Sequence, residues 1–207
     1  MPRHLKGAAL VVGATACVVL LVAAGTFAAS RPPLISYLVQ GHDAPGFAPS
    51  AKPLVYTTAA EWGAALGPKS TAEPRLAKEG FVEALTQSIT YSADPTSGAG
   101  VSWVVEVGSA ADATREAAAD LTRLEVGGDG ASVTKRYSLK GIPGSHAWID
   151  QAPVEENFYS ANTILTEGSC VLLIGVERSA GGSLSNVMGP IQSAATSILR
   201  RTHKRCP

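Results

Sequence analysis

Residues 158–178, FYSANTILTEGSCVLLIGVER, hold two apolar runs that are separated by Gly168 and Ser169. The first run, from Phe158 to Glu167, and the second, from Cys170 to Arg178, are rich in β-branched, aromatic and aliphatic residues that favour strands. A two-residue connection containing glycine is typical of a tight turn between paired strands. This stretch therefore predicts a β-hairpin, around which the remaining elements can be arranged.

Further strands are expected N-terminal to this hairpin, and helices on both sides of it. The predicted strands are residues 81–92, 101–108, 131–139 and 146–151. The predicted helices are residues 58–66, which begin with the capping-box spacing of Thr58 and Glu61, residues 70–79, the segment from Ser109 to Gly127, and residues 186–203. Hairpins dominate this order, so the sequence predicts an α+β domain: a largely antiparallel sheet packed with helices, as in an α/β/α sandwich.

Two of these helices have a clear apolar face. The helix after Ser109 carries an apolar stripe of Ala113, Ala117, Leu121 and Leu124, opposite Arg115, Glu116 and Arg123. The last helix carries Val187, Ile191, Ala194, Ile198 and Leu199 on one face. Both helices are therefore expected to pack on the sheet through these faces.

Cys170 and Cys206 are expected to form a disulfide. A strand over residues 170–178 would extend about 30 Å, and a helix over residues 186–203 would return about 27 Å, so its end would lie near Cys170. The alternative is two free thiols. A metal site is not predicted, because two cysteines without paired histidines supply too few ligands.

The N-terminal segment predicts export. Residues 1–7 contain Arg3, His4 and Lys6, and residues 8–29 are uncharged. As a helix, residues 8–29 would extend about 33 Å, which is enough to cross the hydrocarbon core of a bilayer. Two alternatives stay open, a signal peptide cleaved near Ala28 and a lipoprotein anchored at Cys17.

The expected organisation follows from this segment. Residues 1–7 would be a cytoplasmic tail, residues 8–29 a transmembrane anchor in contact with membrane lipid, residues 30–52 a proline-rich spacer, and residues 53–207 an extracytoplasmic α+β domain. An apolar stretch at residues 34–39 could dock on that domain. The chain is thus expected to be a single-pass membrane protein with its C-terminal domain outside the cytoplasm, or else a secreted protein.

Charge and motifs exclude several functions. Lys plus Arg and Asp plus Glu both number 17, so no broad basic surface and no nucleic-acid partner are expected. Motifs for nucleotide, zinc or thiol-redox chemistry are absent. Ser145, His146 and Asp150 have the residue types of a hydrolytic triad, but Ser145 and His146 would point to opposite faces of a strand. No catalytic residue, metal or cofactor is therefore predicted.

A ligand-binding groove is predicted beside residues 141–144, Gly-Ile-Pro-Gly. These residues are typical of a turn, and as a functional site they would form the rim of a groove. Pro143 would belong to that rim, and Trp103, Trp148, Phe158 and Tyr159 could line the groove, as aromatic side chains often do. The alternative for the aromatic residues is packing in the core.

Four short stretches carry a resemblance to known proteins: DAPGF at 43–47, GFV at 80–82, SAADA at 109–113 and GIPGS at 141–145. Together they resemble small exported domains of high-GC Gram-positive bacteria, many of them uncharacterised lipoproteins. They are also similar to the extracytoplasmic sensor domain of a mycobacterial serine/threonine kinase. Over residues 34–206 the resemblance implies helices around an antiparallel sheet and a binding or sensing role, and it implies no catalytic residue. Unlike that kinase, this chain has no kinase domain, and its exported cysteines suffice for one disulfide.

The sequence therefore predicts a non-enzymatic, membrane-anchored domain that binds or senses a small ligand or an envelope component. One alternative is an interaction subunit of a membrane protein complex, for which Ala9 and Gly13 have the small-residue spacing of helix contacts. A further alternative is a secreted hydrolase that uses His146.

Overall fold

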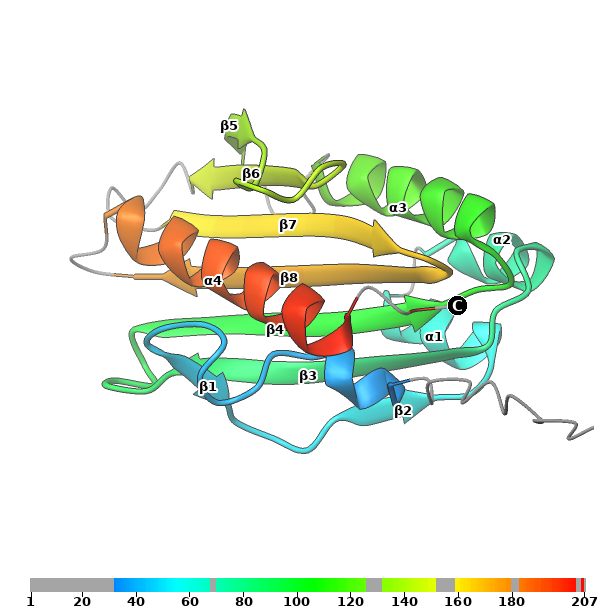
Figure 1. Cartoon of the computed structure of the whole chain (residues 1–207), viewed down its shortest axis with the longest axis horizontal. Coiled ribbons are helices and arrows are strands. Elements are labelled where there is room, and N and C mark those ends of the chain that lie inside the picture. Colours follow the sequence, from blue (N-terminus) through cyan, green and yellow to red (C-terminus); the bar gives the residue numbers. More distant parts are fainter. Residues whose placement is uncertain are drawn as a thin grey trace, which may run out of the picture. The chain divides into compact units, whose positions relative to one another are not determined.

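The hairpin at Gly168 and Ser169 lies in the middle of one antiparallel sheet (Figure 1). The computed structural model describes residues 32–67, 70–125, 132–151, 159–179 and 183–203, together with Cys206. Its strands are β1 (Phe47–Pro49), β2 (Leu54–Tyr56), β3 (Glu83–Tyr91), β4 (Gly98–Glu106), β5 (Ser132–Tyr137), β6 (His146–Gln151), β7 (Tyr159–Glu167) and β8 (Cys170–Arg178).

These strands have the order β1-β3-β4-β8-β7-β6-β5, and β2 also pairs with β3. Every pairing is antiparallel. In the central hairpin Glu167 faces Cys170 across the turn, and Gly168 has φ +55°, a conformation that glycine adopts without strain. The predicted antiparallel α+β fold is therefore confirmed, with the hairpin in the position that the sequence indicates.

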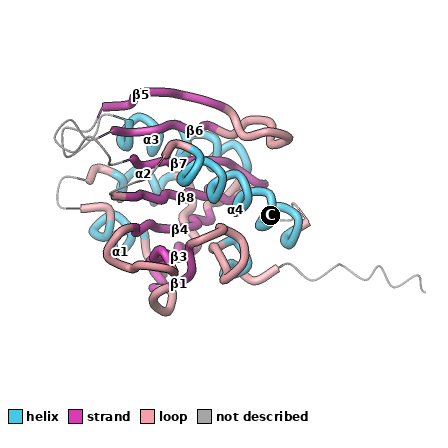
Figure 2. Tube along the Cα trace, turned by 90° about the vertical axis from the view of Figure 1, so that its left-hand side faces the viewer, coloured by secondary structure: helices cyan, strands magenta, loops and turns pink. Residues whose placement is uncertain are grey.

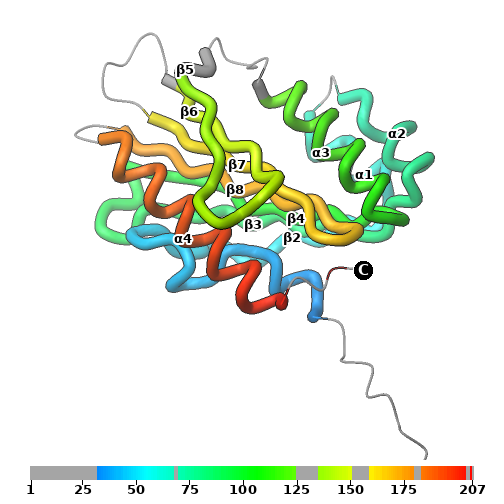
Figure 3. The backbone as a smooth tube through the Cα atoms, turned by 45° about the horizontal axis from the view of Figure 1, so that its top comes forward, coloured from blue at the N-terminus to red at the C-terminus, as the bar shows by residue number. Residues whose placement is uncertain are grey.

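Helices cover both faces of the sheet (Figures 2 and 3). On one face lie α4 (Ser185–Thr202) and the 3₁₀-helix η1 (Leu34–Tyr37). On the other face lie α1 (Ala59–Ala65), α2 (Ala72–Lys78) and α3 (Ala110–Glu125). Each face of the sheet thus has its own apolar core, and the side chains of β4, β7 and β8 alternate between the two cores.

The local signals in the sequence explain how these helices begin and end. Thr58 and Glu61 form the predicted capping box at the start of α1, where the Thr58 hydroxyl accepts from the Glu61 N–H at 3.2 Å. Gly80 follows the C-cap of α2 with φ +69°, a conformation that ends a helix at little cost. The predicted face of α4 is buried against the sheet at Val187, Ile191, Ala194 and Ile198.

The prediction of a spacer over residues 30–52 is wrong for the part that the structure describes. Leu34, Tyr37, Leu38 and Val39 are buried in the core beneath α4, and β1 is a strand of the sheet. The prolines that indicated a spacer are compatible with this placement, because Pro49 lies in β1 at the edge of the sheet, where proline is tolerated. The folded domain therefore begins before Leu34, not at Pro53, and the expected docking of residues 34–39 is confirmed.

The predicted membrane anchor at residues 8–29 lies outside the described residues. Among the helices that the structure does describe, none combines the length and the apolar character that crossing a bilayer requires.

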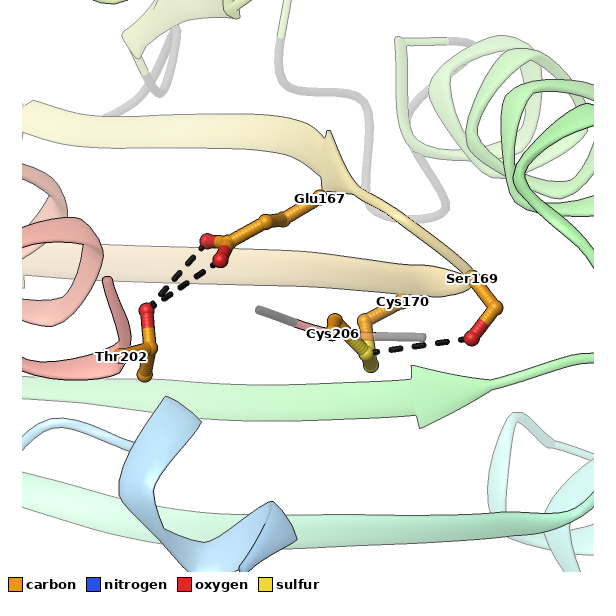
Figure 4. The surroundings of a disulfide bond; sticks show 5 residues. All are labelled: Glu167, Ser169, Cys170, Thr202 and Cys206. Atoms are coloured by element: carbon orange, nitrogen blue, oxygen red, sulfur yellow. Dashed lines mark hydrogen bonds between the residues drawn. A yellow bond between two sulfur atoms is a disulfide. The ribbon is translucent and has the colours of Figure 1, made fainter. Parts of the chain in front are cut away.

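The predicted disulfide joins Cys170, the first residue of β8, to Cys206 beyond α4 (Figure 4). The two Cα atoms lie 5.8 Å apart, within the ordinary range for a disulfide. Beside it the Ser169 hydroxyl lies 3.9 Å from the Cys206 sulfur, and the Thr202 hydroxyl donates to the Glu167 carboxylate at 3.4 Å. The disulfide therefore ties the end of α4 to the central hairpin.

Candidate functional site

A groove lies between α3 and strands β6 and β7, and it has a cavity volume of about 470 Å³. One wall is α3, and the other is made by residues of β7 together with the start of β6 and the turn before it. Its lining residues are Thr114, Ala117, Ala118, Leu121, Thr122, Gly144, His146, Ile164, Leu165 and Thr166. The groove is large enough to hold a small organic molecule.

The lining of this groove is mainly apolar. Two of its α3 residues, Thr114 and Thr122, already donate their hydroxyl protons to the carbonyl oxygens of Ala110 and Ala118, each at 2.9 Å. His146 is the lining residue that carries an imidazole, and it is exposed at the start of β6. The groove therefore offers apolar contacts along its length and a hydrogen-bonding imidazole at one position.

The predicted aromatic groove residues lie elsewhere. Trp103 and Trp148 are 5% and 1% exposed, and both belong to the core between the sheet and α1–α3. The ring of Trp103 packs edge-to-face on Trp62, with centroids 5.6 Å apart, and Trp148 Nε1 donates to Asp150 Oδ2 at 3.1 Å. Core packing, the alternative that the sequence left open, accounts for both residues.

The other residues predicted to form the groove do not lie beside Trp103 and Trp148 in the structure. Tyr159 is half-buried and packs against the opposite core, beneath α4. Pro143 is exposed in its turn, and Phe158 lies outside the described residues. Gly144, the neighbour of Pro143, does line the groove beside α3. Gly144 is therefore the residue of the predicted rim, residues 141–144, that lines this groove.

Ser145, His146 and Asp150 do not meet as a triad. The Ser145 hydroxyl donates to the Ile142 carbonyl oxygen at 2.9 Å and accepts from the Leu139 N–H at 3.0 Å, which fixes the turn before β6. Asp150 Oδ2 accepts hydrogen bonds from Trp148 Nε1 and from Asn162 Nδ2. Ser145 is buried whereas His146 is exposed, as the alternation along a strand predicts.

A buried charged cluster joins α2 to α3, and the sequence pattern did not predict it. The Arg75 guanidinium donates to both oxygens of Glu116, from Nε at 2.6 Å and from Nη2 at 2.9 Å. Glu116 was expected on the polar side of α3, but its side chain is fully buried because α2 packs there. The sequence gives a weak indication of this burial: Glu116 and Asp120 are four residues apart, directly beside the apolar positions Ala117 and Leu121.

Two other carboxyl groups complete this cluster. Glu79, which directly follows α2, is 5% exposed, and Asp120 is fully buried beside Arg123. Burial, together with the neighbouring Glu116 carboxylate, raises the pKa of Glu79 to about 7. The same two causes raise the pKa of Asp120 to about 6. Within the described residues, no set of three histidine, cysteine or acidic side chains is placed to hold a metal ion.

Comparison with known proteins supports the fold. No protein-family model matches the sequence, and no curated protein matches it at a significant level. Among solved structures, the chain is similar to the extracellular domain of PknH from Mycobacterium tuberculosis, with a TM-score of 0.50 and 14% sequence identity. The match covers 77% of this chain and 86% of that domain. The resemblance to an extracytoplasmic kinase sensor domain is therefore confirmed at the level of the fold.

Proposed function

We propose that this chain is a non-catalytic, membrane-anchored protein whose α+β domain lies outside the cytoplasm and binds a small, mainly apolar ligand in the groove between α3 and β7. Residues 8–29 would supply the anchor and contact the membrane lipid. The observation that carries the proposal is the groove itself, with a volume of about 470 Å³ and an apolar lining.

Two further observations support this proposal. A disulfide such as Cys170–Cys206 persists in oxidising compartments outside the cytoplasm. The fold is also that of a domain described as extracellular in another protein. Neither observation identifies a ligand, so the choice of ligand rests on the lining: apolar along α3 and β7, with His146 available to a polar end group.

Filling the groove should abolish binding without unfolding the protein. Ala118 is an exposed residue of α3 that lines the groove, so Ala118→Trp places a large ring there at little cost to the core. With decanoate as the probe, we expect the wild-type protein to show NMR shift changes at Ala117, Leu121 and Ile164, and Ala118→Trp to lose them.

The matched control for this experiment is Ala111→Trp, because Ala111 is exposed on the same helix and is not among the groove residues. This variant should bind decanoate as the wild-type protein does. Equal binding by both tryptophan variants, or shift changes scattered away from the groove, would show that the groove is not the binding site.

A reporter fusion tests the proposed location. Alkaline phosphatase fused after Pro207 should be active in cells, because this enzyme needs disulfides that form outside the cytoplasm. A cytoplasmic reporter at the same position should be inactive. The reverse pattern would contradict the proposed topology.

A further inference from the structure

The cluster between α2 and α3 places three carboxyl groups in a space from which water is largely excluded. Glu116 and Asp120 are fully buried, and Glu79 is 5% exposed. Arg75 engages both oxygens of Glu116, and Arg123 Nη2 donates to Asp120 at 3.1 Å. The Glu79 carboxyl group faces Glu116, and it forms a longer ion pair in which Arg115 Nε lies 3.8 Å from Glu79 Oε1.

The hydrogen bonding of this cluster is incomplete for three ionised carboxylates. Glu79 Oε2 and Asp120 Oδ2 are buried oxygens that accept no hydrogen bond from the described residues. A buried charged oxygen without a partner is strongly unfavourable. A proton on Glu79 would remove one of the charges and could be donated to Glu116, forming a carboxyl–carboxylate hydrogen bond.

The groups around Glu79 make its protonation sensitive to pH near neutrality. From α3 it is faced by Glu116 and Arg115, and from α2 by Arg75. Arg115 is also paired with Asp112, and its side chain is largely exposed to solvent. Burial and the Glu116 carboxylate outweigh the two arginines, so the pKa of Glu79 is raised to about 7 from a reference value of 4.5.

We propose that Glu79 and Glu116 share a proton in the folded protein, and that release of this proton in alkaline surroundings loosens α3 and weakens ligand binding in the groove. The link is direct in the chain: Glu116 and Asp120 immediately precede Ala117 and Leu121, which line the groove. The regulatory part of this inference rests on the function proposed above. The inference that Glu79 and Glu116 share a proton does not depend on that function.

The sharing of a proton between Glu79 and Glu116 can be tested without any ligand. A group whose pKa is raised on folding stabilises the folded state below its unfolded pKa, and this stability is lost as the pH rises through the folded pKa. For the full chain in detergent, we therefore expect the Tm of the wild-type protein to fall between pH 5 and pH 8, by roughly 5–10 °C. Glu79→Gln, which resembles the protonated acid, should reduce this fall by about half or more, because Asp120 still titrates.

The matched control is Glu73→Gln, an exposed acid on α2 that should leave the wild-type pH dependence of the Tm unchanged. A second measurement avoids any change of sequence: the ¹³C shift of the Glu79 carboxyl carbon should titrate near pH 7. Titration near pH 4.5, or a Glu79→Gln variant whose Tm falls as steeply as that of the wild-type protein, would overturn the proposal.

The coupling to the groove needs its own experiment. Decanoate should bind the wild-type protein several-fold more weakly at pH 8 than at pH 6, and Glu79→Gln should lose most of this difference. Because the His146 side chain lies in the groove, the comparison is repeated in a His146→Gln background, which separates any effect of the imidazole from that of Glu79. Decanoate affinity that is independent of pH in this background would overturn the coupling. If decanoate does not bind at all while Glu79 still titrates near pH 7, the proposed function fails and the shared proton stands.

Discussion

Replacing Cys206 by serine should lower the free energy of unfolding by about 4 kcal/mol, because the disulfide closes a loop with a sequence separation of 36 residues. In a protein of this size such a loss corresponds to a fall in Tm of roughly 8–15 °C. The disulfide joins the first residue of β8 to the segment beyond α4, so its loss frees the end of the helix that covers one core. Urea unfolding, followed by tryptophan fluorescence, measures the change.

Two controls separate the disulfide from a general effect of substitution. Cys17→Ser removes the remaining cysteine, which belongs to the predicted anchor, and should leave the unfolding midpoint unchanged. Reduction with dithiothreitol should bring the wild-type protein close to the midpoint of Cys206→Ser and should not affect that variant. A wild-type midpoint that ignores the reductant would contradict a stabilising disulfide.

The parts of the fold that could be predicted are those governed by neighbours in sequence. The β7–β8 hairpin follows from two apolar runs and a two-residue turn, and the start of α1 from the spacing of Thr58 and Glu61. The disulfide required an additional step, because it depends on a strand and a returning helix of similar length. Each of these predictions uses the geometry of one or two adjacent elements.

The parts that were missed depend on packing between distant segments. Proline and glycine around residues 41–46 suggested a spacer, yet the apolar side chains of Leu34 and Phe47 are buried because α4 provides a surface for them. Glu116 read as a solvent-exposed residue, yet Arg75 from another helix makes its burial possible. The spacing of apolar and polar residues within one helix or strand does not indicate a partner from a distant segment.

The residues of the predicted groove show the same dependence on packing between distant segments. Trp103 and Trp148 were candidates because aromatic residues line many ligand sites, but both side chains pack in the core between the sheet and α1–α3. The groove is instead lined mainly by small and aliphatic residues of α3 and β7. Its existence depends on how closely α3 approaches the sheet, which composition does not determine.

Arg201 should contribute strongly to stability, because it holds residues 36–43 against α4. Its guanidinium donates to both carboxylate oxygens of Asp43, at 2.9 and 2.8 Å, and to the carbonyl oxygens of Ser36 and Leu38, at 3.1 and 2.9 Å. Arg201→Met keeps much of the aliphatic length but leaves the buried Asp43 without its cation. We expect a loss of roughly 3–5 kcal/mol in the free energy of unfolding, as for other buried pairs that lose one partner.

The neighbouring Arg200→Met is the matched control, because Arg200 is exposed on the same turn of α4 and should change the stability by less than about 0.5 kcal/mol. Hydrogen exchange locates the effect: in Arg201→Met the amides of Leu38 and Val39 should exchange faster, while those of the β7–β8 hairpin change less. The Val39 N–H reports directly, because it donates to the Ser102 hydroxyl of β4 at 3.1 Å and is protected only while this segment is docked. Equal stability of the two methionine variants would mean that the core contacts of Leu34, Tyr37 and Leu38 hold the segment without the arginine.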